Sequence, residues 1–333
     1  MKSLKFSPRS ELAIIALNHL IASFVTTINH INDMDTYEQL KKLEDRINDA
    51  DAIVIGVASG MSAASGFRFY YMDDATYRMI AGGLADKYDI HSMFDLLYDP
   101  RISRGEWWAM ILRTIKYIYE CETGETYKDL AELVKGKNYY AVTTNQDAQL
   151  FRVFPDDKIT RLQGDWRYFQ TKDRSVDEIF YNHDMVMDLI PKIQGDVLPE
   201  EYFPRYEKTG VELVPWVRSR EFLEGKFYME EFERYMRFLR QNLNKKTLFL
   251  ELGVGMMTPM FIKEPFMNMV YQWKDATYAT INPKHAIIPK EIASKSIAID
   301  RDINCALRTM LGKPTDHMTD SDSKDVFNPA RAY

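Results

Sequence analysis

The sequence predicts an α/β fold, with a Rossmann-like, mostly parallel sheet and a smaller, mainly helical inserted module. Short apolar runs recur without the alternation of a half-exposed strand, at 52–58, 139–144, 159–163, 247–253, 278–281 and 296–300. Strands that are apolar throughout are usually covered on both faces, as in parallel sheets. Helical stretches separate several of these runs, which favours crossover helices between parallel strands.

The first expected elements lead into this sheet. The uncharged stretch at 12–31 is interrupted by polar residues, so we expect a packed N-terminal helix there rather than a targeting segment. The pattern at 36–50 is that of an amphipathic helix. The run at 52–58 then enters a loop rich in serine and glycine at 59–66, which predicts a buried strand, a tight turn and a helix.

The rest of the chain divides by composition. The stretch 69–137 is mostly helical and aromatic, and we expect it as an insertion in the Rossmann-like domain. The stretch 165–243 carries many charges and four prolines, which indicates a separate module. The expected organisation is an N-terminal helical segment at 1–50, a Rossmann-like domain at 51–164 and 244–312, the small module at 165–243, and a tail at 313–333.

Composition argues against several classes of function. A net charge of −6 and the lack of a basic cluster argue against a nucleic-acid partner. The two cysteines, Cys121 and Cys305, fit neither a disulfide framework nor a four-cysteine zinc site, so we expect no metal and a reducing, cytoplasmic location. Outside 12–31 no stretch is long and apolar enough to span a bilayer, and we expect no membrane partner.

Five predicted strands end in polar or glycine-rich segments, at 59–66, 143–147, 162–165, 251–259 and 281–283. Ligands gather at the carboxyl ends of strands in open α/β sheets, and N–H groups at a helix start suit a pyrophosphate. Asn145 could hydrogen-bond sugar hydroxyls, and Asp147 could steady positive charge developing on a ribose. A tight turn or a helix N-cap would explain any one segment alone. Five together favour a ligand site.

The order and spacing of these segments resemble the sirtuin family. Gly-Met-Ser-Ala-Ala-Ser-Gly at 60–66 is similar to its first glycine-serine motif, and Thr-Thr-Asn-Gln-Asp at 143–147 is similar to its Thr-Gln-Asn-Ile-Asp motif. Leu-Gln-Gly at 162–164 stands where sirtuins carry a catalytic Leu-His-Gly. The segment 253–259 stands for the family's Gly-Thr-Ser, and Asn282 for its adenosine-side asparagine.

The departures from that family point to one of its branches. The zinc cysteines and the Ile-Pro-Asp-Phe-Arg segment of sirtuins are absent, and Gln163 replaces the catalytic histidine. This combination resembles the macrodomain-linked class M sirtuins, which are protein ADP-ribosyltransferases. That resemblance implies a lipoyl-carrier protein related to the glycine-cleavage H protein as substrate, and a macrodomain hydrolase as functional partner.

The chemistry of Gln163 agrees with that direction. A glutamine amide does not titrate near pH 7, so it lacks the general-base function that deacylation takes from a histidine. Losing a general base typically costs about 10²–10⁴-fold in rate. Nicotinamide loss needs less help from an acid or base, because the pyridinium of NAD is already a good leaving group. ADP-ribose transfer to a nucleophile, or to water, therefore remains open.

The resemblance implies NAD as the cofactor. Ser59, Gly60 and Ser62 are expected at the pyrophosphate, Asn145 and Gln163 at the nicotinamide ribose, and Asp147 beside the cationic sugar. The expected catalytic residues are Asn145, Gln163 and Asp147, and the expected cofactor-binding residues are Ala58, Ser59, Gly60, Ser62, Thr144, Asn145, Gln163, Gly253, Val254, Gly255, Asn282, Pro283, Asp302 and Ile303. Three alternatives stay open: an NADase, an NAD-dependent deacylase, and a non-enzymatic NAD sensor.

Overall fold

The computed structural model describes residues 36–315. The predicted helix at 12–31 and the predicted tail from 316 onward lie outside the described residues. The helix expected at 36–50 is α2 (Thr36–Asp49). The short 3-10 helices are η1 (Gln149–Arg152), η2 (Asp156–Lys158), η3 (Ile190–Lys192), η4 (Glu200–Tyr202), η5 (Pro259–Phe261) and η6 (Lys290–Lys295).

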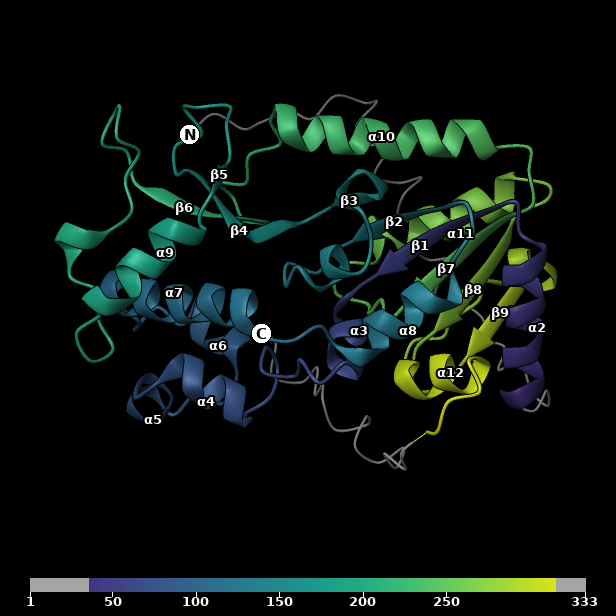
Figure 1. Ribbon diagram of the computed structural model, residues 1–333, viewed down its shortest axis with the longest axis horizontal. Coiled ribbons are helices and arrows are strands. Elements are labelled where there is room, and N and C mark those ends of the chain that lie inside the picture. Colours follow the sequence, from purple (N-terminus) through teal and green to yellow (C-terminus); the bar gives the residue numbers. More distant parts are fainter. Residues whose placement is uncertain (1–35, 316–333) are drawn as a thin grey trace, which may run out of the picture.

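A six-stranded sheet forms the larger part of the molecule (Figure 1). Its strands are β1 (Ala52–Val57), β2 (Tyr139–Thr143), β3 (Ile159–Arg161), β7 (Thr247–Leu252), β8 (Thr277–Ile281) and β9 (Ser296–Ile299). Their order is β3-β2-β1-β7-β8-β9, and every neighbouring pair is parallel. This sheet confirms the predicted α/β class. The chain passes outward from β1 to β3 and then returns to the other side of β1, so the sheet has a topological switch point there.

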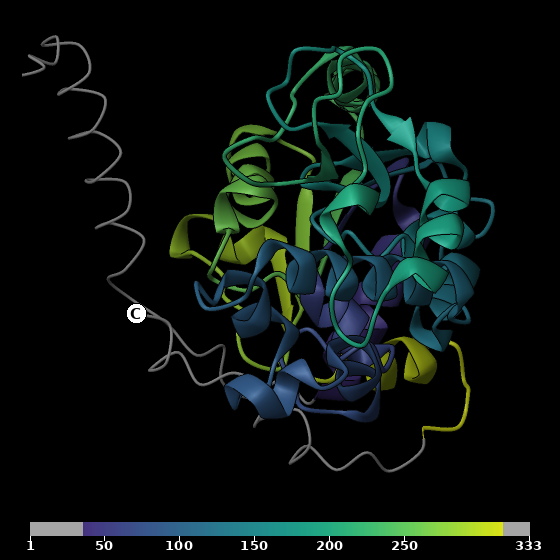
Figure 2. The ribbon, with the colours of Figure 1, turned by 90° about the vertical axis from the view of Figure 1, so that its left-hand side faces the viewer.

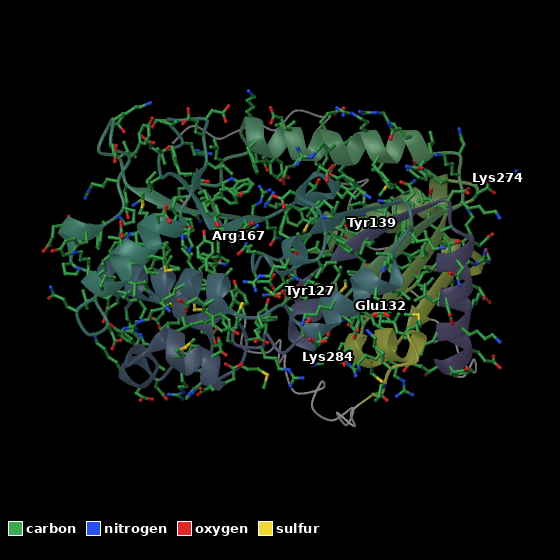
Figure 3. The ribbon with its side chains drawn as sticks, in the orientation of Figure 1. Tyr127, Glu132, Tyr139, Arg167, Lys274 and Lys284 are labelled. Carbon is green, nitrogen blue, oxygen red and sulfur yellow. The ribbon has the colours of Figure 1, made fainter. Side chains whose placement is uncertain are left out.

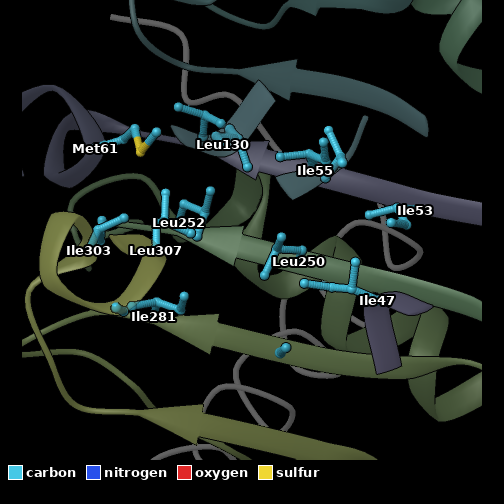
Figure 4. Close-up of a cluster of buried hydrophobic side chains, with 14 of the residues drawn as sticks. Ile47, Ile53, Ile55, Met61, Leu130, Leu250, Leu252, Ile281, Ile303 and Leu307 are labelled. Carbon is cyan, nitrogen blue, oxygen red and sulfur yellow. The ribbon is translucent and has the colours of Figure 1, made fainter. Parts of the chain in front are cut away.

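Helices cover both faces of this sheet. The first face packs on α2, α3 (Ser59–Ala64), α8 (Glu125–Leu133) and α12 (Ile303–Met310), whose apolar side chains meet those of β1, β7 and β8 in Figure 4. The second face packs on α10 (Lys226–Asn242) and α11 (Lys263–Gln272). Within β1, Ile53 and Ile55 belong to the first cluster and Val54 to the second, which explains why the strand is apolar throughout.

The smaller part of the molecule joins two segments that are far apart in sequence. One contributes α4 (Ala75–Ala81), α5 (Leu84–Tyr88), α6 (Met93–Tyr98) and α7 (Arg104–Glu120), and the other contributes α9 (His183–Leu189) and an antiparallel sheet of β4 (Gly164–Thr171), β5 (Phe180–Tyr181) and β6 (Leu213–Val217). They share one apolar cluster, in which the rings of Trp108 and Phe169 meet edge to face at 5.7 Å. The helices at 69–120 therefore pack on the small sheet.

Helix α10 connects the two parts. Its first turns contact Trp216 and Phe222 of the small module through Tyr228, and its later turns pack on the six-stranded sheet through Tyr235 and Leu239. The helix lies along one side of both parts in Figure 1 and is seen end-on in Figure 2. Among the helices of residues 36–315, none combines the length and apolar character that crossing a membrane requires.

Candidate functional site

The segments expected at strand ends meet at one edge of the six-stranded sheet. Hydrogen bonds continue the ladder past the strands, from Ala58 N to Leu252 O (3.1 Å), Thr144 N to Val57 O (3.1 Å), Leu162 N to Thr143 O (2.8 Å), Gly253 N to Ile281 O (3.1 Å) and Asn282 N to Ile299 O (3.0 Å). The arrowheads of this sheet point towards the smaller part of the molecule (Figure 1). The candidate site is therefore this carboxyl edge.

Two glycines hold the loops after β1 and β7 in direct contact. Gly60 N–H donates to Gly253 O at 3.1 Å. A Cβ added to Gly60 would lie 2.6 Å from the Cα of Gly253, and a Cβ added to Gly253 would lie 2.6 Å from the Cα of Gly60. Gly253 also has a φ of +70°, which favours glycine. Backbone packing between the two loops is thus sufficient to require both residues.

Four polar side chains form a network beside α3, which we call the Tyr127 network: Ser62, Tyr127, Asn145 and Asp147. Ser62 Oγ donates to Asp147 Oδ2 at 2.5 Å and lies 3.1 Å from Tyr127 OH. Asn145 Nδ2 donates to Tyr127 OH at 3.1 Å and to Ala58 O at 2.9 Å. The hydroxyl hydrogen of Ser62, expected at a pyrophosphate, has Asp147 as its acceptor in this structure.

Burial sets the titration of this network. It raises the pKa of Asp147 above its usual 3.8, while the hydrogen bond from Ser62 acts in the opposite direction. Burial also raises the pKa of Tyr127 well above 10, so that its hydroxyl keeps its proton. Tyr127 lies near the middle of the molecule in Figure 3, between Arg167 of β4 and Glu132 of α8 in this view.

Gln163 lies between β3 and β4, where the six-stranded sheet passes into the small module. Its carbonyl oxygen accepts from Gln146 Nε2 at 3.0 Å and from Arg218 N at 2.9 Å. Its partly exposed side-chain amide makes no hydrogen bond with the described residues. The next residue, Gly164, has a φ of +83°, and a Cβ there would lie 2.0 Å from Trp216 O. The backbone is thereby fixed while the amide of Gln163 stays available.

Arg218 adjoins Gln163 in the candidate site and was not among the residues predicted from the sequence. Its Nη2 donates to Leu162 O at 2.9 Å, and its Nη1 pairs with Glu224 at 2.5 Å. Its Nε is buried without a hydrogen-bond partner among the described residues. The guanidinium stacks over the ring of Phe222, with 4.1 Å between the guanidinium carbon and the ring centroid. In the sequence this arginine follows an unremarkable strand, so only the fold shows that it adjoins Gln163.

Buried charges support the connection that carries Gln163. Arg161 and Asp165 are each 1% exposed, and Glu231 is fully buried. Arg161 Nε donates to Asp165 at 3.0 Å, its Nη1 pairs with Glu231, and Arg167 Nη2 adds a second cation to Asp165 at 2.7 Å. These cations hold the pKa of Asp165 below its usual value although burial acts to raise it. The group ties β3, β4 and α10 together on both sides of Gln163.

The residues expected on the adenosine side are mostly occupied by structural contacts. Asn282 Nδ2 donates to Val254 O at 3.0 Å, and its Oδ1 accepts from Lys284 N and His285 N. Asp302 caps α12 by accepting from the Cys305 N–H at 3.1 Å. Ile303 is 1% exposed and packs in the core of the first sheet face. These contacts shape the loops of this side.

Two other features lie apart from this edge. A cavity of about 250 Å³ opens at the amino end of the sheet, lined in part by Arg46, Lys246 and Lys274, and Lys274 stands at the far end of the sheet in Figure 3. Between residues 36 and 315, no three histidine, cysteine, aspartate or glutamate side chains are placed to hold a metal ion.

Two proteins of known name resemble the chain in sequence. It is 30% identical over 297 residues to a protein ADP-ribosyltransferase of Staphylococcus aureus, a match that covers 87% of this chain and 93% of that protein. It is 24% identical over 234 residues to a probable bifunctional ADP-ribose hydrolase/ADP-ribosyltransferase of Fusarium oxysporum, covering 67% of this chain and 39% of that protein. No family model matches the chain.

Solved structures resemble the fold. A sirtuin from a study of substrate affinity superimposes with a TM-score of 0.53 at 15% identity, covering 82% of this chain and 98% of that one. A Sir2 protein in complex with a p53 peptide and NAD+ superimposes with a TM-score of 0.51 at 15% identity, covering 82% and 97%. At such identities the likeness concerns the fold.

Proposed function

Since the chain belongs to the protein ADP-ribosyltransferases and has a sirtuin fold, we propose that it transfers ADP-ribose from NAD to a lipoyl-carrier protein. It is an NAD-dependent enzyme. The family membership carries the transfer of ADP-ribose to a protein, which agrees with the chemistry of the carboxyl edge. Three polar groups there have no hydrogen-bond partner among the described residues: Asn145 Oδ1, the Gln163 amide and Arg218 Nε.

In the proposed arrangement the nicotinamide end of NAD lies against Asn145, Gln163 and Asp147. The Asn145 oxygen accepts a hydrogen bond from a ribose hydroxyl, and the Gln163 amide, which has no partner among the described residues, can both donate to and accept from the ribose hydroxyls. The Asp147 carboxylate stabilises the positive charge that grows on the ribose, and its desolvation strengthens that interaction. The loops that begin at Ser59 and Gly253 take the pyrophosphate and the adenosine, together with Ala58, Gly60, Ser62, Thr144, Val254, Gly255, Asn282, Pro283, Asp302 and Ile303.

The proposed reaction needs no general base at Gln163. The bond between nicotinamide and ribose breaks with its electron pair going to the nicotinamide nitrogen, so nicotinamide leaves as a neutral molecule. The nucleophilic atom of the acceptor forms the new bond to the same ribose carbon, and its proton passes to solvent. Arg218 lies beside the Gln163 backbone, where its cation would favour an anionic group on the acceptor or the cofactor.

The acceptor and its partner enzyme follow from the resemblance to class M sirtuins. We propose a lipoylated carrier related to the glycine-cleavage H protein as the acceptor. We also propose that a macrodomain hydrolase removes the modification. The name of the Fusarium relative, which joins an ADP-ribose hydrolase to an ADP-ribosyltransferase, supports that functional pairing.

The proposal is tested by incubating the purified chain with NAD and a lipoylated carrier, followed by mass spectrometry of protein and small molecules. ADP-ribose on the lipoylated carrier, with none on the unlipoylated carrier, is the expected result. Free ADP-ribose without protein modification would indicate an NADase instead. Intact NAD together with measurable binding would indicate a sensor.

A deacylation assay distinguishes the proposed transferase from the remaining alternative, an NAD-dependent deacylase. Because Gln163 has no titratable group, we expect no deacylation of an acetyl-lysine peptide by the wild type. Gln163→His restores an imidazole at this position, yet we expect little gain, since the Pro-Asp-Phe-Arg segment of deacylating sirtuins is absent. Vigorous NAD-dependent deacylation by the wild type would contradict the transferase assignment.

A further inference from the structure

The orientation of the Asn145 amide is fixed by its partners. Its nitrogen lies 2.9 Å from Ala58 O and 3.1 Å from Tyr127 OH. A carbonyl oxygen only accepts hydrogen bonds, so the group facing Ala58 must be the NH2. Both amide hydrogens are therefore used inside the protein, and Oδ1 accepts no hydrogen bond from the described residues. What Asn145 offers a ligand is thus an acceptor, which suits a sugar hydroxyl.

The direction of the neighbouring hydrogen bonds follows from the same reasoning. Tyr127 OH accepts from Asn145 Nδ2, so its own hydrogen is directed to Ser62 Oγ at 3.1 Å. Ser62 Oγ in turn donates to Asp147 Oδ2, because an ionised carboxylate only accepts. The donors run in one order from Asn145 through Tyr127 and Ser62 to Asp147. Hydrogen bonds in such a chain polarise and strengthen one another.

Tyr127 is placed to hold this chain rigidly. It lies on α8, its side chain is fully buried, and it belongs to the apolar cluster on the first face of the sheet. Its ring is therefore fixed by packing, while its hydroxyl reaches Ser62 from α3 and Asn145 from the loop after β2. A phenylalanine would fill the same space, so core packing alone does not account for the hydroxyl.

We propose that Tyr127 is a positioning residue for the reaction: its hydroxyl holds the Asn145 amide so that Oδ1 accepts a hydrogen bond from a hydroxyl of the nicotinamide ribose. The inference rests on the proposed function, because it takes the carboxyl edge as the NAD site. Tyr127 touches no reacting atom and acts through Asn145.

Binding of ADP-ribose, which carries the same ribose hydroxyls, tests the role without turnover. Isothermal titration calorimetry on wild type, Tyr127→Phe, Asn145→Ala and the double variant gives a double-mutant cycle. We expect Tyr127→Phe to weaken binding roughly five- to tenfold, the effect of one misplaced hydrogen bond. In the Asn145→Ala background the same substitution should change affinity less than about twofold, since the group that Tyr127 positions is gone.

A matched control removes another buried tyrosine hydroxyl. Tyr140 OH lies 3.0 Å from Thr160 Oγ1 on the second face of the sheet, and Tyr140→Phe should bind ADP-ribose as the wild type does. Unchanged affinity of Tyr127→Phe would overturn the inference, as would an equal loss in both Asn145 backgrounds. If Tyr127→Phe does not fold, Ser62→Ala breaks the next link of the chain and undergoes the same cycle; because Ser62 also lies in the proposed pyrophosphate loop, only the part of its loss that disappears in the Asn145→Ala background supports the inference. Nicotinamide release from NAD by the wild type is measured separately, and its absence would count against the proposed function alone.

Discussion

Two groups of polar side chains lie near the carboxyl edge of the sheet, on its opposite faces. The Tyr127 network packs with α3 and α8 on the first face. The second group, which we call the Glu251 network, consists of Glu251, Lys263, Tyr278 and Thr280. Glu251 accepts from Lys263 Nζ (2.6 Å), Tyr278 OH (2.6 Å) and Thr280 Oγ1 (3.0 Å), and Lys263 also donates to His285 O (3.1 Å).

The two networks differ in what they leave unused. Glu251 is fully buried, and its carboxylate and the Lys263 ammonium are satisfied within the protein. In the Tyr127 network, Asn145 keeps an oxygen without a partner among the described residues, and Asp147 is partly exposed. Buried polar groups are nearly always hydrogen-bonded. A network that keeps an unsatisfied acceptor near the surface, which we call open, therefore indicates a ligand. A network whose groups are all satisfied within the protein, which we call closed, indicates a role in stability.

The largest effect on transfer activity is expected from the carboxylate of the Tyr127 network. Asp147→Asn removes the charge that faces the ribose, and we expect transfer to fall about 10²–10³-fold, as when a preorganised electrostatic partner is removed. Wild-type activity should also fall as the pH falls through the pKa of Asp147, which burial raises above 3.8. This acid limb should be absent in Asp147→Asn. A wild-type acid limb that the variant retains would contradict the role given to Asp147.

The contribution of Asp147 to the free energy of unfolding should change with pH in the opposite direction to its contribution to activity. The folded pKa of Asp147 is raised, so the folded state binds this proton more tightly than the unfolded state does. Its contribution is therefore fully present below the unfolded value of 3.8 and is lost as the pH rises through the folded pKa. Chemical denaturation at several pH values, compared between wild type and Asp147→Asn, measures this difference.

Removing the amide of the Tyr127 network should affect activity far more than folding. Asn145→Ala deletes the free acceptor and the hydrogen bond to Ala58 O, and we expect transfer to fall about 100-fold because the ribose is misplaced. The loss in unfolding free energy should be about 1 kcal/mol. Rate and denaturation measurements on one preparation check both values. If Asn145→Ala kept the activity of the wild type, Asn145 would not belong to the site.

The side-chain amide of Gln163 extends the comparison beyond the network. Gln163→Ala should lower transfer roughly 10- to 30-fold, corresponding to the loss of one or two hydrogen bonds to the ribose hydroxyls. Its side chain has no partner among the described residues, so thermal unfolding should be almost unchanged. Because Gln163 does not titrate, the dependence of the transfer rate on pH between about 6 and 8 should be the same in the wild type and in Gln163→Ala. Strong destabilisation would show that Gln163 serves the fold.

The smallest effect on transfer activity is expected from a substitution in the Glu251 network. Tyr278→Phe removes one donor from Glu251 and should lower the unfolding free energy by about 1–2 kcal/mol. Transfer by the folded protein should stay within about twofold of wild type. A large loss of transfer activity in Tyr278→Phe, with an unchanged free energy of unfolding, would show that the Glu251 network also serves the reaction and would contradict the comparison.

The sequence predicted the central sheet better than the small module. The runs at 52–58 and 139–144 became β1 and β2 almost residue for residue, because both faces of these strands are buried. Strand β4 was not predicted, since it carries Asp165 and Arg167, whose burial depends on an ion pair that a hydropathy pattern does not reveal. Strand β6 contains Pro215 and lies at the edge of its sheet, where proline is tolerated.

The convergence of the polar strand ends at one edge could be predicted from the sequence, but the hydrogen bonds of the candidate site could not. Polar strand ends of a parallel sheet converge at one edge, so Asn145 and Gln163 were expected near each other. The partners of Ser62 are 65 and 85 residues away, and no local pattern distinguishes Asp147 from a phosphate as its acceptor. Tyr127 packs with Leu130 in the apolar cluster on the first face of the sheet, and nothing in the sequence indicates what its hydroxyl contacts.

The contact between Gly60 and Gly253 limits how this protein could be redesigned. Replacing either glycine with alanine would bring its Cβ to 2.6 Å from the backbone of the other loop. A library that randomises one loop to change cofactor preference would therefore recover glycine at this position unless the facing loop moves. The two loops are one unit for engineering, although nearly two hundred residues separate them, and grafting from another protein should transfer both together.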